Sequence, residues 1–159
     1  MLGNRYLSEP VNPKERRLVL RLLGHWRDLC GDRDWPGLSD VASAGMGDMW
    51  DFSFVIELNG GKPKFRHFGA WHAEFYGTDM SGHDLDALTR DTLAERSTRY
   101  LPEVLRRRIP ITYGGEVTEP SGRKILYRSI LLPLSDNGET LTGILGGANC
   151  KLAADQDGA

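Results

Sequence analysis

Apolar residues recur at helical spacing in the first part of the chain. Asn12 and Pro13 are residue types that begin helices, and Gly31 is a type that ends one. Between them the apolar positions fall three or four residues apart, at Leu18, Leu22, Trp26 and Leu29. This spacing predicts an amphipathic helix over 13–30, and its apolar face must be covered by something.

Further along, the hydrophobic pattern changes to alternation with a period of two, which indicates β-strands. At most one short helix is expected before the first strand, near 39–47. Helical spacing separates the second strand from the third, and a break is expected at Pro102 because proline lacks the backbone donor. The strands predicted in this way are 52–58, 64–69, 111–118, 123–134 and 141–151.

The strand at 123–134 is apolar on both faces, so both faces of the sheet must be covered. The helix at 13–30, alone or with a partner's copy, is expected over the second face, where glycines near Gly146 allow close approach. We therefore predict an α+β domain. It has a five-stranded antiparallel sheet with helices on one face, and the N-terminal amphipathic helix lies outside that core. Residues 12–151 form the domain, between a flexible arm at 1–11 and a frayed tail at 152–159.

The composition excludes several classes of partner. Twenty basic and 22 acidic side chains give a net charge of −2, so no global field recruits nucleic acid or an anionic membrane. The apolar stretches are too short to span a bilayer, and the first residues lack the apolar core of a signal peptide. Two cysteines, Cys30 and Cys150, in a chain without an export signal favour reduced thiols. We expect a cytoplasmic protein.

Catalytic motifs are absent from the sequence. It contains no Gly-x-Ser-x-Gly elbow, no phosphate-binding loop and no His-Glu-x-x-His pair. His67, His72 and His83 have no spacing that forces them to converge on a metal. Arginines cluster at 96–108, which the dipole at a helix end explains in large part, while an anionic ligand or partner stays open.

Several short motifs follow one another in a recognisable order. They are His25-Trp26-Arg27, Trp35-Pro36, Phe65-Arg66 with Gly69, and Tyr76-Gly77-Thr78-Asp79-Met80-Ser81-Gly82. Together with the order of the strands, they resemble the PAS domain family, and more narrowly a group of small bacterial PAS proteins common in alphaproteobacteria. The chain departs from that group between Asp40 and Asp51, where leucine and proline are usual, so any role of that segment is open.

The resemblance implies a sensory or regulatory module. Haem-binding members resemble a design with a histidine on the long helix before the third strand, and this chain has none over 89–108. Photoactive flavin members place a cysteine where this chain has Thr78–Gly82, so neither cofactor is expected. A small metabolite stays open as a ligand. The candidate pocket residues on the helices and the sheet are Trp71, His72, Phe75, Tyr76, Tyr100, Tyr113 and Tyr127, with a plain packed core as the alternative.

We therefore expect a stand-alone regulatory protein that acts through protein–protein contacts. A homodimer, or contact with a signalling partner, is expected through Leu18, Leu22, Trp26 and Leu29 of the N-terminal helix. The alternative is a small cone-shaped α+β isomerase or dehydratase. It would need His72 with Glu74, or Asp79, at the bottom of a closed pocket. A purely structural docking module without a ligand is the third possibility.

Overall fold

The computed structural model describes residues 13–153. Its helices are α2 (Pro13–Cys30), α3 (Ala70–Tyr76), α4 (Leu93–Thr98) and α5 (Leu101–Arg107), with short 3₁₀ helices η1 (Leu38–Asp40), η2 (Ser43–Gly45), η3 (Gly47–Phe52) and η4 (Leu85–Ala87). Its strands are β1 (Ser53–Glu57), β2 (Lys64–Phe68), β3 (Ile111–Thr118), β4 (Lys124–Leu134) and β5 (Gly143–Leu152). The predicted arm, and the predicted tail beyond residue 153, lie outside the described residues.

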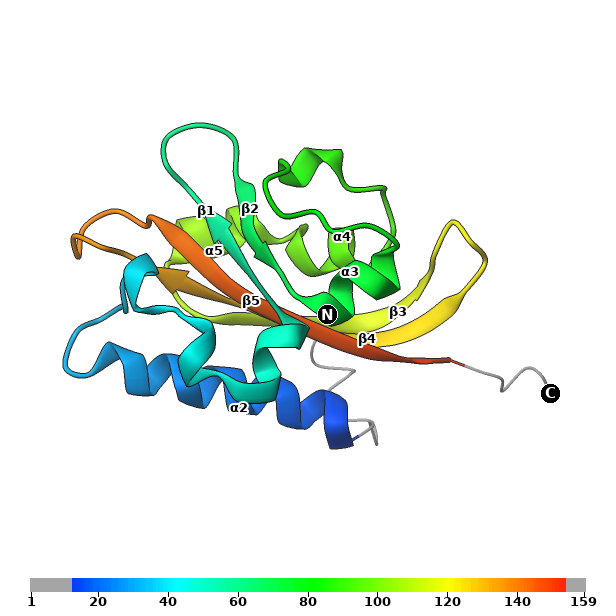
Figure 1. The fold of residues 1–159 in the computed structure, drawn as a ribbon, viewed down its shortest axis with the longest axis horizontal. Coiled ribbons are helices and arrows are strands. Elements are labelled where there is room, and N and C mark those ends of the chain that lie inside the picture. The colour runs from blue at the N-terminus through cyan, green and yellow to red at the C-terminus, as the bar shows by residue number, and fades with distance from the viewer. Residues whose placement is uncertain (1–12, 154–159) are drawn as a thin grey trace.

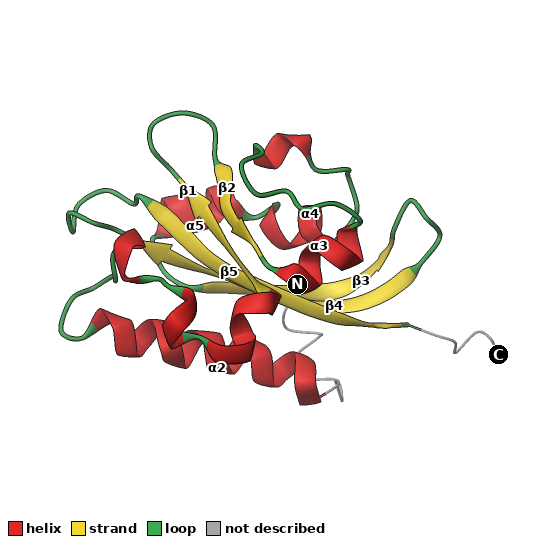
Figure 2. Ribbon diagram, in the orientation of Figure 1, coloured by secondary structure: helices red, strands yellow, loops and turns green. Residues whose placement is uncertain are grey.

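The five strands form one sheet in the order β2-β1-β5-β4-β3, and every neighbouring pair is antiparallel. Helices α3, α4 and α5 lie on one face of this sheet, and α2 crosses the other face (Figure 1). Figure 2 shows the resulting three layers, with strands between the two groups of helices. The predicted fold class is confirmed.

The predicted helix at 13–30 forms with those bounds and packs against its own sheet. Leu22 is 0% exposed, and Leu18 and Trp26 are also buried, in a cluster with residues of β1, β4 and β5. The Trp26 indole donates to the Pro133 carbonyl at 2.8 Å. The sequence suggested that these three side chains form a surface for a partner. They are instead covered by the protein's own sheet. Leu29, the fourth predicted contact, is half-buried.

Two consecutive glycines of β5 allow close packing on both faces. A Cβ at Gly147 would clash with Leu22 of α2, and a Cβ at Gly146 would clash with the Phe54 ring and lie 2.9 Å from Leu131 Cδ2 on the other face. The sequence placed all these glycines under the N-terminal helix. The alternation of a strand instead sends Gly146 to the side of α3–α5.

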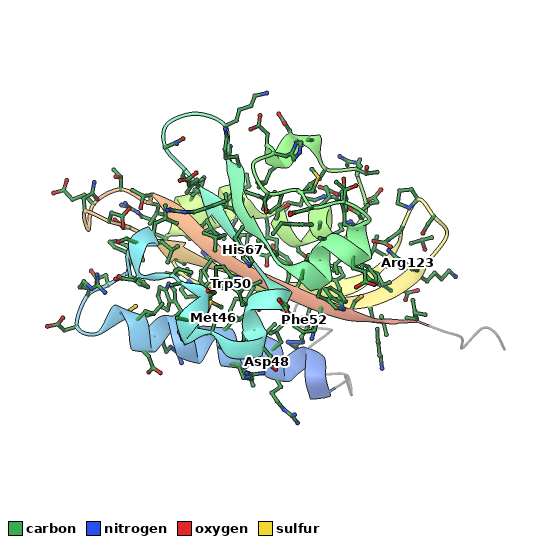
Figure 3. All side chains as sticks on the ribbon, in the orientation of Figure 1. Met46, Asp48, Trp50, Phe52, His67 and Arg123 are labelled. Atoms are coloured by element: carbon green, nitrogen blue, oxygen red, sulfur yellow. The ribbon has the colours of Figure 1, made fainter. Side chains whose placement is uncertain are left out.

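The segment between α2 and β1 differs most from expectation. In place of one helix near 39–47 it forms η1, η2 and η3, because its glycines and short apolar runs do not sustain a longer helix. Met46 and Met49 are buried in the α2-side cluster, and Asp48 pairs with Arg21 at 2.7 Å. The part of the chain that departs from the PAS group thus packs beside α2, against both this helix and the sheet (Figure 3).

The break at Pro102 occurs as predicted and divides the long helical stretch into α4 and α5. Thr92 caps α4 by accepting a hydrogen bond from the Glu95 backbone N–H. Pro102 lies in the first turn of α5, where its missing N–H costs nothing. Glu119, at the end of β3, accepts from the Leu93 backbone N–H at 2.8 Å and so holds the start of α4 on the sheet.

Candidate functional site on the helix-covered face

A chain of hydroxyl groups joins α5 to the sheet. The Tyr100 hydroxyl lies 2.8 Å from Ser129 Oγ on β4, and Ser129 donates to the Tyr113 carbonyl on β3 at 3.0 Å. The Tyr113 hydroxyl donates to Glu103 at 2.9 Å, and the rings of Tyr100 and Tyr113 lie edge to face at 4.4 Å. Two of the predicted pocket tyrosines, Tyr100 and Tyr113, thus belong to one hydrogen-bonded network that joins α5 to the sheet.

The hydroxyls of this face stay protonated near neutral pH. Burial raises the pKa of Tyr100 and of Tyr127, and the hydrogen bond to Glu103 raises the pKa of Tyr113. A phenol with a raised pKa is a hydrogen-bonding group and a poor general base. The arrangement therefore suits ligand or packing contacts better than proton transfer.

His72 is buried in an aromatic cluster at the start of α3. Its Nε2 lies 2.9 Å from the Phe52 carbonyl, and its ring lies 5.1 to 5.7 Å from Trp71, Phe54 and Phe68. Burial lowers the pKa of His72 to about 4, so the imidazole is neutral under most conditions. We interpret it as an anchor between α3 and the start of β1.

The other predicted residues gather elsewhere on the same face. Trp71 and Phe75 stack at 4.9 Å and pack with Tyr127 in a separate cluster, and Arg123 lies 3.8 Å above the Phe75 ring. The Tyr76 hydroxyl instead accepts from the Thr89 backbone N–H at 3.0 Å. The seven predicted residues therefore divide between clusters and do not surround one site.

The centre of this face is filled by side chains of the sheet. Phe54 and Leu131 are at most 1% exposed and leave no room over Gly146 even for a methyl group. A flavin ring or a haem over Gly146 would require these two side chains to move. With this packing, the position over Gly146 has no space for either group.

An open depression of about 270 Å³ lies beside this centre, between η4 and the α4–α5 helices. Its apolar lining comes from Pro63, Leu85, Leu101 and Pro102. Sequence reasoning missed it because these residues come from three separate segments, and no local spacing connects them. Only the packing of η4 against α5 brings them together.

The histidines and cysteines do not form a metal site within residues 13–153. His67 stacks on Trp50 at 3.6 Å, and its Nε2 lies 3.0 Å from the Trp50 carbonyl (Figure 3). Burial lowers the pKa of His67. Cys30 and Cys150 are not joined by a disulfide bond. No described helix has the length and the apolar character needed to cross a bilayer.

Neither acid–base pair of the enzyme alternative is present in a closed pocket. Glu74 is exposed while His72, on the same helix, is buried and bonded to a backbone carbonyl. Asp79 is also exposed and accepts from the Ser81 backbone N–H at 3.0 Å. This geometry gives the enzyme alternative no support.

The arginine cluster is mostly neutralised by neighbouring acids. Arg96 and Arg99 pair with Asp91 at 3.1 and 2.9 Å, and Arg107 pairs with Glu103 at 3.0 Å. Arg106 is different, because it makes no ion pair or side-chain hydrogen bond with any described residue.

Comparison with known proteins gives a family and a fold. The family model described as "PAS domain" matches residues 15–148. No curated protein matches the chain. A PAS domain from Colwellia psychrerythraea is 15% identical, with a TM-score of 0.51 over 70% of this chain and 95% of that one. A light-oxygen-voltage domain, studied with a flavin analogue, is 11% identical, with a TM-score of 0.53 over 73% of this chain and 86% of that one. At these identities the likeness shows the fold alone.

Proposed function

This chain belongs to the PAS domain family, whose members are generally sensory or regulatory, and we propose that it acts through protein–protein contacts. Binding at the helix-covered face would change how the sheet packs against α2, and α2 would pass the change to a partner. The module would carry out no catalysis of its own. Its cytoplasmic location and its homodimer stay predictions.

The observation that carries this proposal is the glycine pair of β5. Gly146 is in close contact with Phe54 and Leu131 on one face, and Gly147 is in close contact with Leu22 of α2 on the other. Closely packed cores transmit small displacements because they cannot absorb them in voids. A shift of Phe54 would therefore move β5 and, through it, α2.

The input would be a small molecule or another protein. The depression beside α5 is one place where a small apolar ligand would reach this face, since Leu101 lines the depression and is also part of the cluster around Phe54. Flavin and haem are not part of the proposal, because the centre of the face is filled by Phe54 and Leu131.

Hydrogen exchange across the sheet tests the coupling. Gly146→Ala forces Phe54 to move, and we expect faster amide exchange in α2, on the opposite face, than the loss of global stability explains. Val104→Ala is the matched control, because Val104 is buried in the same cluster as Phe54 but lies on α5. If both variants change α2 exchange only in proportion to global stability, the proposed route is wrong.

A further inference from the structure

Helix α5 is apolar on two sides. Its inner residues Leu101 and Val104 are at most 4% exposed and pack in the core. On its outer side Pro102 is exposed, Leu105 is 38% exposed, and Ile109, just past its end, is 42% exposed. Pro102 and Leu105 lie three residues apart on the same side of the helix, and Ile109 follows after the turn at Arg108. We call these three exposed side chains the row. The fold does not use this second apolar row.

The exposure of Ile109 is held in place by its neighbours. Arg108 has a left-handed backbone (φ 61°) that costs a non-glycine residue free energy. Trp35 compensates, because its indole donates to the Arg108 carbonyl at 3.2 Å and its ring lies 5.2 Å below the guanidinium. The Arg108 guanidinium also donates to the Glu139 carbonyl. The turn that directs Ile109 outward is thus stabilised by side-chain contacts.

The depression described above adjoins the row at Pro102. The depression of about 270 Å³ shares Pro102 with it, has apolar residues in its lining, and carries the ion pairs Lys62–Asp86 and Arg99–Glu95 among its lining residues. Its volume is below the range of about 300–1,000 Å³ typical of sites for whole ligands. One large apolar side chain would fill it, as an anchor residue does at a protein interface.

The charge beside the row is positive. Arg106 lies next to Leu105 and makes no ion pair among residues 13–153, although Glu103 interacts with it electrostatically, and Arg107 is the residue that pairs with Glu103. The three arginines at 106–108 outnumber this single acid. A second copy of the chain docked by the same row would bring two Arg106 side chains together, which is unfavourable. An acidic partner is complementary to the row.

We propose that Pro102, Leu105, Arg106 and Ile109, with the adjoining depression, form a docking site for an acidic amphipathic segment of a partner protein. A large apolar side chain of that segment fills the depression, and a carboxylate pairs with Arg106. The inference rests on the proposed function, since it names the chemistry of a partner through which the module acts. The binding test below does not depend on coupling to α2. The docking site and the proposed coupling can therefore be disproved independently.

Selection from a phage-displayed library of random peptides, with the full chain as bait, tests the site. We expect the enriched peptides to combine acidic residues with an aromatic or large aliphatic one. Arg106→Glu should weaken their binding about tenfold or more in fluorescence anisotropy, as should Leu105→Ser. Arg106 is exposed and makes no ion pair among residues 13–153, so its replacement should leave the circular dichroism unchanged and alter the unfolding curve little.

Matched controls lie on α2, across the sheet. Leu20→Ser and Arg27→Glu change exposed residues of the same types and should leave peptide binding unchanged. The proposal is overturned if no peptide is enriched, if the enriched peptides are not acidic, or if Arg106→Glu and Arg27→Glu act alike. It is also overturned if the chain prefers vesicles of phosphatidylglycerol and phosphatidylcholine to the peptides, or if Leu105→Ser dissociates a homodimer.

Discussion

His72 is an ionisable residue in the most aromatic part of the molecule. Three rings surround it, and its Nε2 lies within hydrogen-bond distance of the Phe52 carbonyl. Burial opposes the charged form, and this lowers the pKa to about 4 from a reference value of 6.5. The unfolded chain therefore binds more protons than the folded protein between these two pH values.

The stability of the protein should consequently fall as the pH drops from about 6.5 toward 4. Between pH 7.5 and pH 5, His72 alone should account for a loss of about 2 kcal/mol in the free energy of unfolding. Urea unfolding at a series of pH values measures this loss. His72→Gln, which keeps an N–H for Phe52, should remove this share of the pH dependence and leave the share due to half-buried His67. His83→Gln at an exposed turn should not remove the share due to His72. Equal curves for the wild type and His72→Gln would contradict this account.

At the scale of elements, α2 and β5 are fitted together at one point. Leu22 is completely buried and lies against Gly147, where no Cβ is present. A larger residue at 147 would push the helix away from the strand, and a smaller one at 22 would leave a cavity. The two positions are therefore expected to be coupled.

A double-mutant cycle measures this coupling. Gly147→Ala should cost about 1–3 kcal/mol because its Cβ overlaps Leu22, and Leu22→Ala should cost about 2–5 kcal/mol through the cavity. The double variant should be more stable than the sum predicts, by more than about 0.5 kcal/mol, since the new methyl group occupies part of the cavity. Gly24→Ala is the control: nothing lies within 4 Å of its Cβ, so it should stabilise the helix slightly. Additive effects would show that the contact is loose.

The elements differ in how far their local pattern predicted them. Helix 13–30 and the break at Pro102 were predicted because capping residues, regular spacing and a missing donor all act locally. The three 3₁₀ helices of segment 38–52 were not predicted. Glycines interrupt the short apolar runs of this segment, and its conformation follows from where Met46 and Met49 can be buried. Strand β5 also continues to Leu152, pairing with Ile125, where a frayed tail was predicted.

At the scale of the whole molecule, one sheet has a packed core on each face. The α2 core is covered within the chain, so a homodimer through this helix would have to use its outer side, where Leu20 is 58% exposed. This dimer contact differs from the one that the sequence predicted, which used Leu18, Leu22 and Trp26.

Native mass spectrometry tests the assembly and the input together. We expect a dimer that Leu20→Glu converts to a monomer, because a buried charge would be unpaired in the interface. Leu152→Glu, at an equally exposed leucine, should leave the dimer intact. A monomeric wild type would rule out the homodimer. A stoichiometric small molecule released on denaturation would identify a ligand as the input, whereas a ligand-free mass would favour another protein.

The sequence by itself determined the fold class, the order of the elements and the family, because periodicity, caps and turn residues are local and the motifs occur in a fixed order. It did not determine which candidate side chains meet. Trp71 and Tyr100 were predicted to share a site, and they lie in different clusters. The depression beside α5 combines residues from three segments. Such groupings depend on how helices cross the sheet, which is set by packing between residues distant in sequence, and only the tertiary structure decided them.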